Sequence, residues 1–195
     1  IESCFNSAIS LIKSGYSDKL INGPISKKYF LKKKFLGITE YLAHKFKKKK
    51  IAMLIYNKSL SVCPVTTHLP LKYVSKKINK RLIVEKVILI SNFFKKTLGF
   101  KPKIAVTGLN PHCESTNIFN EDIKILKPAI KYLKKKGHII FGPFPADTIF
   151  LKQNRKKYHV ILGMYHDQVL TPIKTLFEYD AINITLGLPF IRVSP

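Results

Sequence analysis

Residues 160–176 read VILGMYHDQVLTPIKTL, and the order of residue types in this stretch indicates the fold class. The apolar run 160–162 predicts a short buried strand, and residues 168–176 have the apolar spacing of a helix, although Pro172 weakens that prediction. His166 lies in the polar segment between them. A strand, a polar loop and a helix in succession form the repeating unit of an α/β fold.

The same alternation extends along the chain on both sides. Apolar periodicity predicts helices over residues 3–14, 27–33, 39–46, 82–98 and 121–136, and strands over 18–22, 51–56, 59–65, 103–107, 139–141 and 181–185. This pattern predicts an α/β fold with a mixed, largely parallel sheet and flanking helices. Residues 1–195 contain no repeat, no low-complexity linker and no clear internal domain boundary.

The composition is that of a folded protein. Hydrophobic residues make up 46% of the 195 residues, which is enough for a core. No apolar run approaches the roughly 20 residues that span a bilayer, so we expect no membrane partner. The first residues lack the basic start and long apolar stretch of a signal peptide. Because the sequence does not begin with methionine and stops just after an apolar run, we expect it to be part of a longer chain.

Lysine gives the sequence a formal net charge of +24. It supplies 32 of the 35 basic residues, and arginine supplies three. Nucleic-acid surfaces usually also use arginine, whose planar guanidinium binds phosphates and bases through paired hydrogen bonds. The lysine runs 32–34, 47–50 and 134–136 fall where helix ends or exposed faces are expected. We therefore interpret the charge as solvated surface and expect no nucleic-acid partner.

Cysteine usage indicates a reducing compartment. The three cysteines, Cys4, Cys63 and Cys113, are odd in number and form no CxxC motif, so structural disulfides are not expected. We expect a cytoplasmic location. Cys113 directly follows His112, but adjacent residues rarely bind one ion together, which favours a role for Cys113 as a small hydrophobic side chain.

Three of the six histidines share one context, just after a predicted strand. They are His68 in VTTHLP (65–70), His112 in GLNPH (108–112) and His166 in GMYHDQ (163–168). Ligands of open α/β sheets bind beyond the carboxyl ends of the strands. Three imidazoles that converge there can hold one divalent ion and leave positions open for a substrate. Asp147 and Asp167 could orient these imidazoles, and a helix N-cap is the equally favoured alternative for Asp147.

Seven segments together resemble one enzyme family. They are GPISKK (23–28), TEYLA (39–43), TTHLPLK (66–72), GLNPH (108–112), GPFPADTIF (142–150), MYHDQ (164–168) and NITLGLPFIR (183–192). Their order and spacing resemble the 4-hydroxythreonine-4-phosphate dehydrogenase family of vitamin B6 biosynthesis, and the resemblance covers essentially the whole chain. It implies an isocitrate/isopropylmalate dehydrogenase-like fold, of which residues 1–195 would be the metal- and substrate-binding region of a two-lobed enzyme.

The resemblance also implies roles for single residues. The family's metal ligands fall on His68, His112 and His166, and its substrate-binding residues fall on Thr39, Lys174, Asn183 and Arg192. We further expect Lys174 and Asp167 to act in catalysis and Asp147 to lie behind the metal ligands. Family members are homodimers whose active sites are shared between subunits. They need one divalent ion (zinc, magnesium or cobalt) and NAD or NADP, whose binding residues the resemblance does not identify in this sequence.

The implied reaction is the oxidation of a small phosphorylated substrate, 4-hydroxy-L-threonine 4-phosphate. The product is a 3-keto acid that decarboxylates to 3-amino-2-oxopropyl phosphate, a step in pyridoxal phosphate biosynthesis. Two alternatives stay open: a dehydrogenase of another phosphorylated four-carbon hydroxy acid, such as phosphoerythronate or phosphothreonate, and a degraded, non-catalytic member of the family.

The sequence departs from the family pattern at several positions. Ile38 stands where the family motif GHTE has a substrate-binding histidine, and Ile38 cannot donate a hydrogen bond. Residues 113–117 replace a glycine-rich segment, and Val169 replaces a glycine. Because residues other than glycine rarely adopt positive φ angles, we expect these loops not to reach the required backbone angles. The family's PGDPAGIGPE-like and VDHGTA-like segments are absent from residues 1–195.

Overall fold

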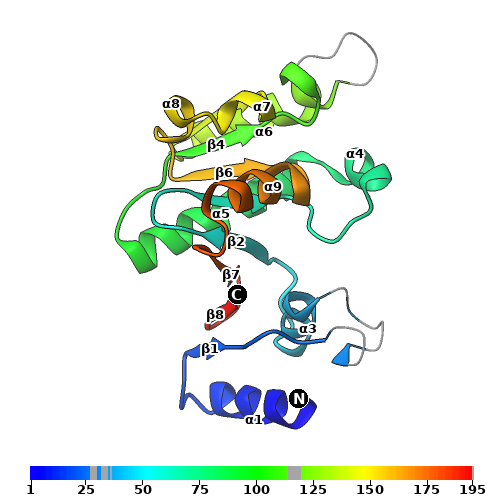
Figure 1. Cartoon of the computed structure of the whole chain (residues 1–195), viewed down its shortest axis with the longest axis vertical. Coiled ribbons are helices and arrows are strands. Elements are labelled where there is room, and N and C mark those ends of the chain that lie inside the picture. Colours follow the sequence, from blue (N-terminus) through cyan, green and yellow to red (C-terminus); the bar gives the residue numbers. More distant parts are fainter. Residues whose placement is uncertain (27–29, 32–34, 36, 114–119, 195) are drawn as a thin grey trace.

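The computed structural model describes residues 1–26, 30, 31, 35, 37–113 and 120–194, and these form one mixed sheet of eight strands (Figure 1). The strand order is β1-β8-β7-β2-β3-β6-β4-β5. The strands are β1 (Lys19–Ile21), β2 (Ala52–Tyr56), β3 (Ser61–Pro64), β4 (Ile104–Thr107), β5 (Ile140–Phe144), β6 (Val160–Gly163), β7 (Ile182–Leu186) and β8 (Ile191–Ser194). The predicted fold class is confirmed.

Parallel pairing brings the histidine loops to one edge of the sheet. β6 pairs in parallel with β3 and with β4, and β4 pairs in parallel with β5. The carboxyl ends of these strands therefore lie side by side, and the segments with His68, His112 and His166 follow three of them. The antiparallel pairs are β2 with β3, β2 with β7, and β7 with β8, while β1 pairs in parallel with β8.

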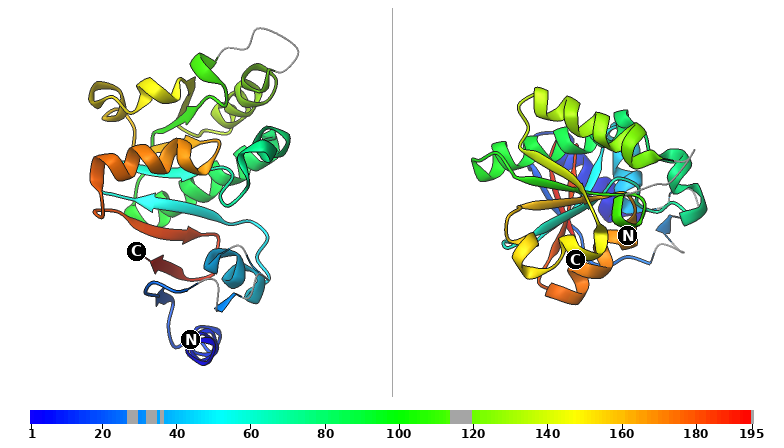
Figure 2. Two further views of the ribbon diagram at one scale, coloured as in Figure 1. Left: turned by 45° about the vertical axis from the view of Figure 1, so that its right-hand side comes forward. Right: turned by 90° about the horizontal axis from the view of Figure 1, so that it is seen from above.

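Two long helices cover one face of the sheet (Figure 2, right). They are α5 (Lys80–Phe93), which continues as a π-helical turn over Phe94–Leu98, and α6 (Lys127–Lys135), which follows a π-helical turn over Asp122–Leu126. Ile83, Val87 and Ile90 form the apolar stripe of α5 and are fully buried. Asn79 caps α5 by accepting a hydrogen bond from the backbone N–H of Leu82 at 2.9 Å.

The other face is covered by α7 (Ala146–Ile149), α8 (Lys152–Arg155) and α9 (His166–Phe177). Val169 and Ile173 of α9 pack against strand residues that include Met53 and Ile161. The helix predicted over residues 168–176 is thus confirmed; it begins two residues earlier and continues through Pro172.

A smaller cluster lies at the β1 end of the sheet, where α1 (Glu2–Lys13) and α3 (Ile38–Lys45) meet (Figure 1). Phe5 stacks on Phe30 with ring centres 5.1 Å apart, and Tyr41 packs edge-on against Phe5 at 5.7 Å. The helix predicted over residues 27–33 falls largely on residues 27–29 and 32–34, which lie outside the described part of the chain.

The structure also contains elements that the sequence did not predict. They are β8, the short helices α4 (Val74–Lys77), α7 and α8, and 3₁₀ turns over Leu71–Tyr73 and Pro111–Cys113. Each spans at most four residues, which is too short for apolar periodicity to identify.

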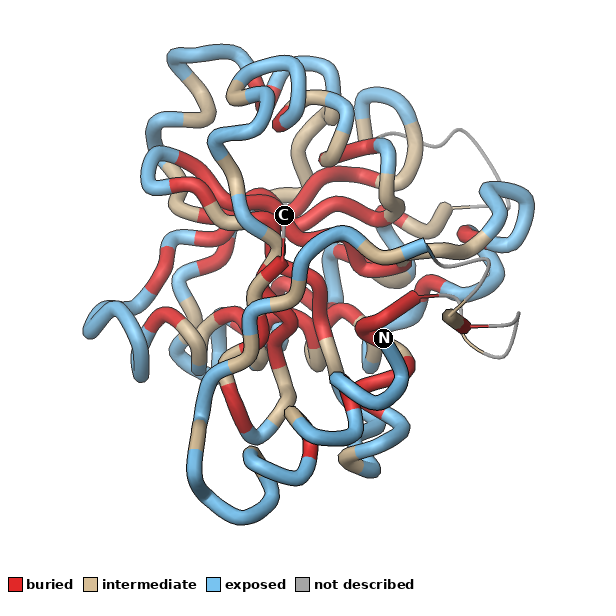
Figure 3. The backbone as a smooth tube through the Cα atoms, turned by 60° about the horizontal axis from the view of Figure 1, so that its bottom comes forward, coloured by how far each residue is buried: buried red, intermediate tan, exposed pale blue. Residues whose placement is uncertain are grey.

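Buried segments follow the strands through the middle of the molecule (Figure 3). In the described residues no helix is both long and apolar enough to cross a membrane.

Candidate active site

Two of the three strand-end histidines lie together. The imidazole rings of His68 and His166 have centroids 6.0 Å apart. Two imidazoles that share one tetrahedral ion have ring centres about 5 Å apart, so this pair lies close to the separation that a common ion requires. The Nδ1 atom of His68 is buried, has no hydrogen-bond partner among the described residues and lies 3.5 Å from Oε1 of Glu40. That carboxylate is well placed to orient the ring.

His166 is oriented by its neighbour. Its Nδ1 lies 2.7 Å from Oδ1 of the exposed Asp167, at the first turn of α9. A hydrogen bond from Nδ1 to the carboxylate selects the tautomer whose Nε2 carries the free lone pair, which is the form a metal ion needs. The orienting role considered for Asp167 thus has a contact in the structure.

His112 lies on a neighbouring cavity. It is exposed, with a φ of 57°, and lines a cavity of about 270 Å³ together with Asp147, Tyr165 and Gln168. Among the described residues no three His, Cys, Asp or Glu side chains are grouped closely enough to hold an ion. A single chain therefore pairs His68 with His166 but does not bring His112 to them, and the three-histidine site stays a prediction.

Asp147 is exposed in the first turn of α7, whose N-cap position is Pro145. It is therefore not the N-cap of that helix. It shares the cavity of His112, but no hydrogen bond between the two is present. Its predicted role behind the metal ligands stays a prediction.

A second cavity, of about 220 Å³, gathers side chains from segments that are far apart in the sequence. Its lining includes Asn22, Ile38, Thr39, His68, Asn183 and Arg192. The Oδ1 atom of Asn183 is buried and has no hydrogen-bond partner in the described residues, so an acceptor is available to a ligand. Three of the four predicted substrate-binding residues and one predicted metal ligand therefore share this cavity.

Arg192 supplies a fixed positive charge to this cavity. It is only 3% exposed, its Nε donates to Oδ1 of Asn22 at 2.8 Å, and its Nη1 donates to Oγ1 of Thr185 at 3.2 Å. Burial lowers the pKa of Arg192 to about 10, and the nearby Glu40 opposes that shift. The guanidinium thus keeps its charge at neutral pH. Thr39 lies at the start of α3, with its Oγ1 3.4 Å from that of Thr185.

Lys174, the fourth predicted substrate-binding residue, lies elsewhere. It follows His166 by eight residues on α9, a separation of about 12 Å along the helix axis. Its side chain is exposed, and Nζ lies 5.7 Å from the centre of the Tyr179 ring. Within one chain Lys174 does not reach the cavity of Arg192, and its role stays a prediction.

The two departures at Ile38 and Val169 differ in their consequences. Ile38 is 8% exposed and lines the cavity beside Thr39, so an apolar surface faces the place where the family pattern has histidine. Val169 lies buried inside α9 with a negative φ, so the expectation that it strains a loop is wrong. Gly163 makes room for it, because a Cβ atom there would lie 2.3 Å from Cγ1 of Val169. Residues 114–119 lie outside the described part of the chain.

Sequence reasoning missed two residues that shape the site. Glu40 lies inside the quoted TEYLA segment but carries no predicted role, and it pairs with His68. Gly37 allows this approach, because a Cβ atom there would lie 2.8 Å from Oε2 of Glu40 and 3.2 Å from Cε1 of His68. A glycine two residues before a predicted helix was the available signal.

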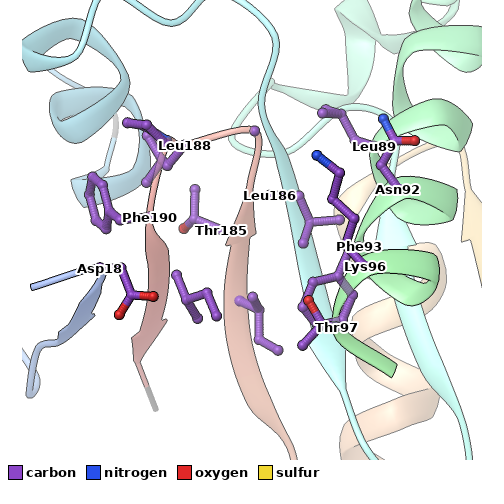
Figure 4. A pocket seen from close by; sticks show the side chains of 14 residues that line it. Asp18, Leu89, Asn92, Phe93, Lys96, Thr97, Thr185, Leu186, Leu188 and Phe190 are labelled. Atoms are coloured by element: carbon purple, nitrogen blue, oxygen red, sulfur yellow. The ribbon is translucent and has the colours of Figure 1, made fainter. Parts of the chain in front are cut away.

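A further cavity of about 340 Å³ lies between α5 and the β7–β8 turn (Figure 4). Ile184 and Leu186 of β7 line it together with Leu89 and Phe93 of α5. Because side chains alternate along a strand, Ile184 and Leu186 lie on the opposite face of β7 from Asn183. None of the predicted site residues lines this cavity, and we assign it no role.

Comparison with known proteins places the chain in a class and then in a family. It has an isocitrate/isopropylmalate dehydrogenase-like fold. It is similar to the crystal structure of 4-hydroxythreonine-4-phosphate dehydrogenase from Klebsiella pneumoniae, with a TM-score of 0.84 and 34% sequence identity. The match covers 98% of this chain and 60% of that one. The model of the family "Pyridoxal phosphate biosynthetic protein PdxA" matches residues 1–195, and the chain belongs to this family.

Two relatives carry different substrate names. 4-Hydroxythreonine-4-phosphate dehydrogenase from Sulfurihydrogenibium sp. is 46% identical over 183 residues, which are 92% of this chain and 56% of the relative. D-threonate 4-phosphate dehydrogenase from Pectobacterium atrosepticum is 38% identical over 195 residues, which are 98% and 60%. The chain thus spans a little more than half the length of these relatives.

Proposed function

We propose that this chain forms the metal- and substrate-binding part of an NAD(P)-dependent dehydrogenase that oxidises 4-hydroxy-L-threonine 4-phosphate. The product is the 3-keto acid that decarboxylates to 3-amino-2-oxopropyl phosphate. The observation that carries this proposal is the single cavity that gathers Thr39, His68, Asn183 and Arg192. Family membership supports it independently.

The cavity residues suit a small phosphorylated acid. Arg192 offers a buried guanidinium whose planar N–H groups match a phosphate or carboxylate, and Thr39 offers a hydroxyl and a backbone N–H at a helix start. Asn183 has a free amide oxygen that can accept a hydrogen bond from a hydroxyl or ammonium group. These three side chains would fix the substrate's orientation relative to His68.

The imidazoles of His68 and His166 would hold one divalent ion, zinc, magnesium or cobalt. Such an ion acts as a Lewis acid that acidifies the substrate's hydroxyl while NAD or NADP accepts the hydride. Glu40 and Asp167 orient the two rings from behind. His112 and Lys174 lie apart from the cavity within one chain, which favours a homodimer in which a second subunit completes each site.

We further propose that the enzyme works in the cytoplasm and has no nucleic-acid partner. Cys4, Cys63 and Cys113 are all free thiols, as expected in a reducing compartment. Burial raises the pKa of Cys63 to about 12, so this thiol stays protonated and unreactive.

Calorimetric binding of 4-hydroxythreonine 4-phosphate to the full chain, with zinc present, tests the proposal. Removing the charged hydrogen bonds of Arg192 by Arg192→Ala should weaken binding by about 2–3 kcal/mol, roughly 30- to 150-fold. Arg81→Ala is the matched control, because Arg81 is exposed and its partner among the described residues is Glu85 on the same helix. Equal affinity of the Arg192 variant and the control would refute the assignment of the cavity.

Oxidation of D-threonate 4-phosphate is the second candidate, favoured by two observations. A relative named for that substrate matches 98% of the chain, and Ile38 removes a polar contact from the cavity. Titrating both substrates into the same protein separates the candidates by their relative affinity. Binding of neither would favour the remaining alternative, a non-catalytic member of the family.

A further inference from the structure

Buried hydrogen bonds to the side chain of Gln168 and to the backbone of Met164 join the three histidine loops. Gln168 is 9% exposed, in the first turn of α9. Its Oε1 accepts from the backbone N–H of Met164 at 2.7 Å and from Oγ1 of Thr107 at 2.8 Å. Its Nε2 donates to the carbonyl of Gly108 at 2.8 Å.

These contacts tie the end of β4 to the end of β6. Met164 precedes His166 by two residues, and Gly108 opens the segment that leads to His112. The carboxylate of the fully buried Asp122 continues the connection, since it accepts from the backbone N–H groups of residues 109 and 110 at 2.8 and 3.1 Å.

The loop of His68 joins the same network through Thr66. The Oγ1 atom of Thr66 donates to the carbonyl of Met164 at 2.8 Å, and its backbone N–H donates to that carbonyl at 3.2 Å. Thr66 precedes His68 by two residues. The backbone of Met164 and the side chain of Gln168 together therefore connect to all three loops.

The network requires a primary amide at position 168. One atom must accept from the N–H of Met164 and another must donate to the carbonyl of Gly108, and these backbone groups cannot exchange roles. The side-chain amide provides both functions, an acceptor oxygen and a donor nitrogen bonded to the same carbon. An apolar side chain of similar length would leave these buried backbone groups without partners, a costly arrangement that the loops can relieve only by moving.

We propose that Gln168 is a positioning residue that sets the relative placement of the three histidine loops and thereby the affinity for the divalent ion. This inference rests on the proposed metal site, since Gln168 touches neither the ion nor the substrate and acts through the loops. Residues that orient metal ligands typically contribute about 10- to 100-fold in metal affinity.

The test measures Co²⁺ affinity and the visible Co²⁺ absorption of the full chain, with thermal unfolding in parallel. Gln168→Met should bind Co²⁺ about 10- to 100-fold more weakly at temperatures where it is folded. Gln153→Met is the matched control, because Gln153 is exposed on α8, and it should bind like the unmodified chain. A purely structural role would lower the unfolding temperature of Gln168→Met and leave its Co²⁺ affinity unchanged, which would overturn the inference.

Thr107→Val provides a second variant, because it removes one donor to Gln168 and keeps the volume of the side chain. It should lose a smaller factor in Co²⁺ affinity, and the double variant with Gln168→Met should bind no more weakly than Gln168→Met, since Thr107 acts through the amide. If Gln168→Met does not fold, unchanged Co²⁺ affinity in Thr107→Val overturns the inference.

Failure of the metal site itself is a distinguishable result. If the unmodified chain shows no Co²⁺ absorption and His68→Ala changes nothing, the proposed function fails. The imidazole NMR signals of His68 and His166 in the metal-free chain then decide the role of Gln168. They should shift in Gln168→Met and not in Gln153→Met, and unshifted signals would overturn the inference.

Discussion

At the scale of single residues, Ile38 gives the cavity proposed for the substrate an apolar wall. It is buried beside Thr39 and offers no hydrogen bond. We expect Ile38→His to bind the phosphorylated substrate roughly 10- to 100-fold more tightly, because one hydrogen bond to a charged group is worth about 1.5–3 kcal/mol. Calorimetry measures the change, with Ile38→Val as an apolar control. A histidine variant no tighter than the valine variant would contradict this role.

Glu178 has an unusual backbone conformation. It ends α9 with φ 48° and ψ −110°, a region that side chains with a Cβ atom rarely adopt. Glycine carries no such penalty, so Glu178→Gly should be more stable to urea unfolding than Glu178→Ala by about 1 kcal/mol, after glycine's greater flexibility in the unfolded chain is subtracted. Equal stability of the two variants would show that the backbone is not strained there.

At the scale of secondary-structure elements, a buried lysine joins α5 to β2. The Nζ atom of Lys86 donates to the carbonyl of Ile51 at 2.5 Å. Burial lowers the pKa of Lys86, and the carboxylates of Glu85 and Glu40 oppose that shift. The folded chain therefore binds this proton less tightly than the unfolded chain does.

The sign of the pH effect follows from this shift. Below the folded pKa the burial cost of the charge is fully present, and it is relieved as pH rises toward the unfolded value of 10.5. The free energy of unfolding of the unmodified chain should thus rise relative to that of Lys86→Met between neutral pH and pH 10.5, by at most about 1.4 kcal/mol per pH unit. Urea unfolding at several pH values measures this, with Lys80→Met as the exposed control. A constant difference would contradict the shift.

The same elements show what the sequence could predict. Apolar periodicity located α5, α6, α9 and most strands, because each is long enough to present a buried face. The position after a strand identified His68 and His166, which the sheet brings together. Gln168 escaped prediction because its partners Thr107 and Gly108 lie 61 and 60 residues away in sequence. Such contacts depend on strand order, which periodicity does not determine.

At the scale of the whole molecule, the described lysine runs lie at the surface, whereas Lys86 is buried. The runs 47–50 and 134–136 are exposed, as expected for solvated charge, while the buried guanidinium of Arg192 faces the substrate cavity. Of the 35 basic residues, we propose that Arg192 and Lys174, rather than the exposed runs, contribute to substrate recognition. The arrangement of the site follows the sheet: Asn183 and Arg192 lie on β7 and β8, and His68 and His166 follow β3 and β6.

In the proposed metal site, His68, His112 and His166 together hold one divalent ion, and a second subunit completes each site. A crystal structure of the zinc-loaded chain with an anomalous zinc map tests it most directly. We predict one zinc peak for each His68, about 2.0–2.1 Å from an imidazole nitrogen of all three histidines, drawn from two subunits. Zinc bound without His68, or with the three imidazoles on separate surfaces of the dimer, would contradict the account.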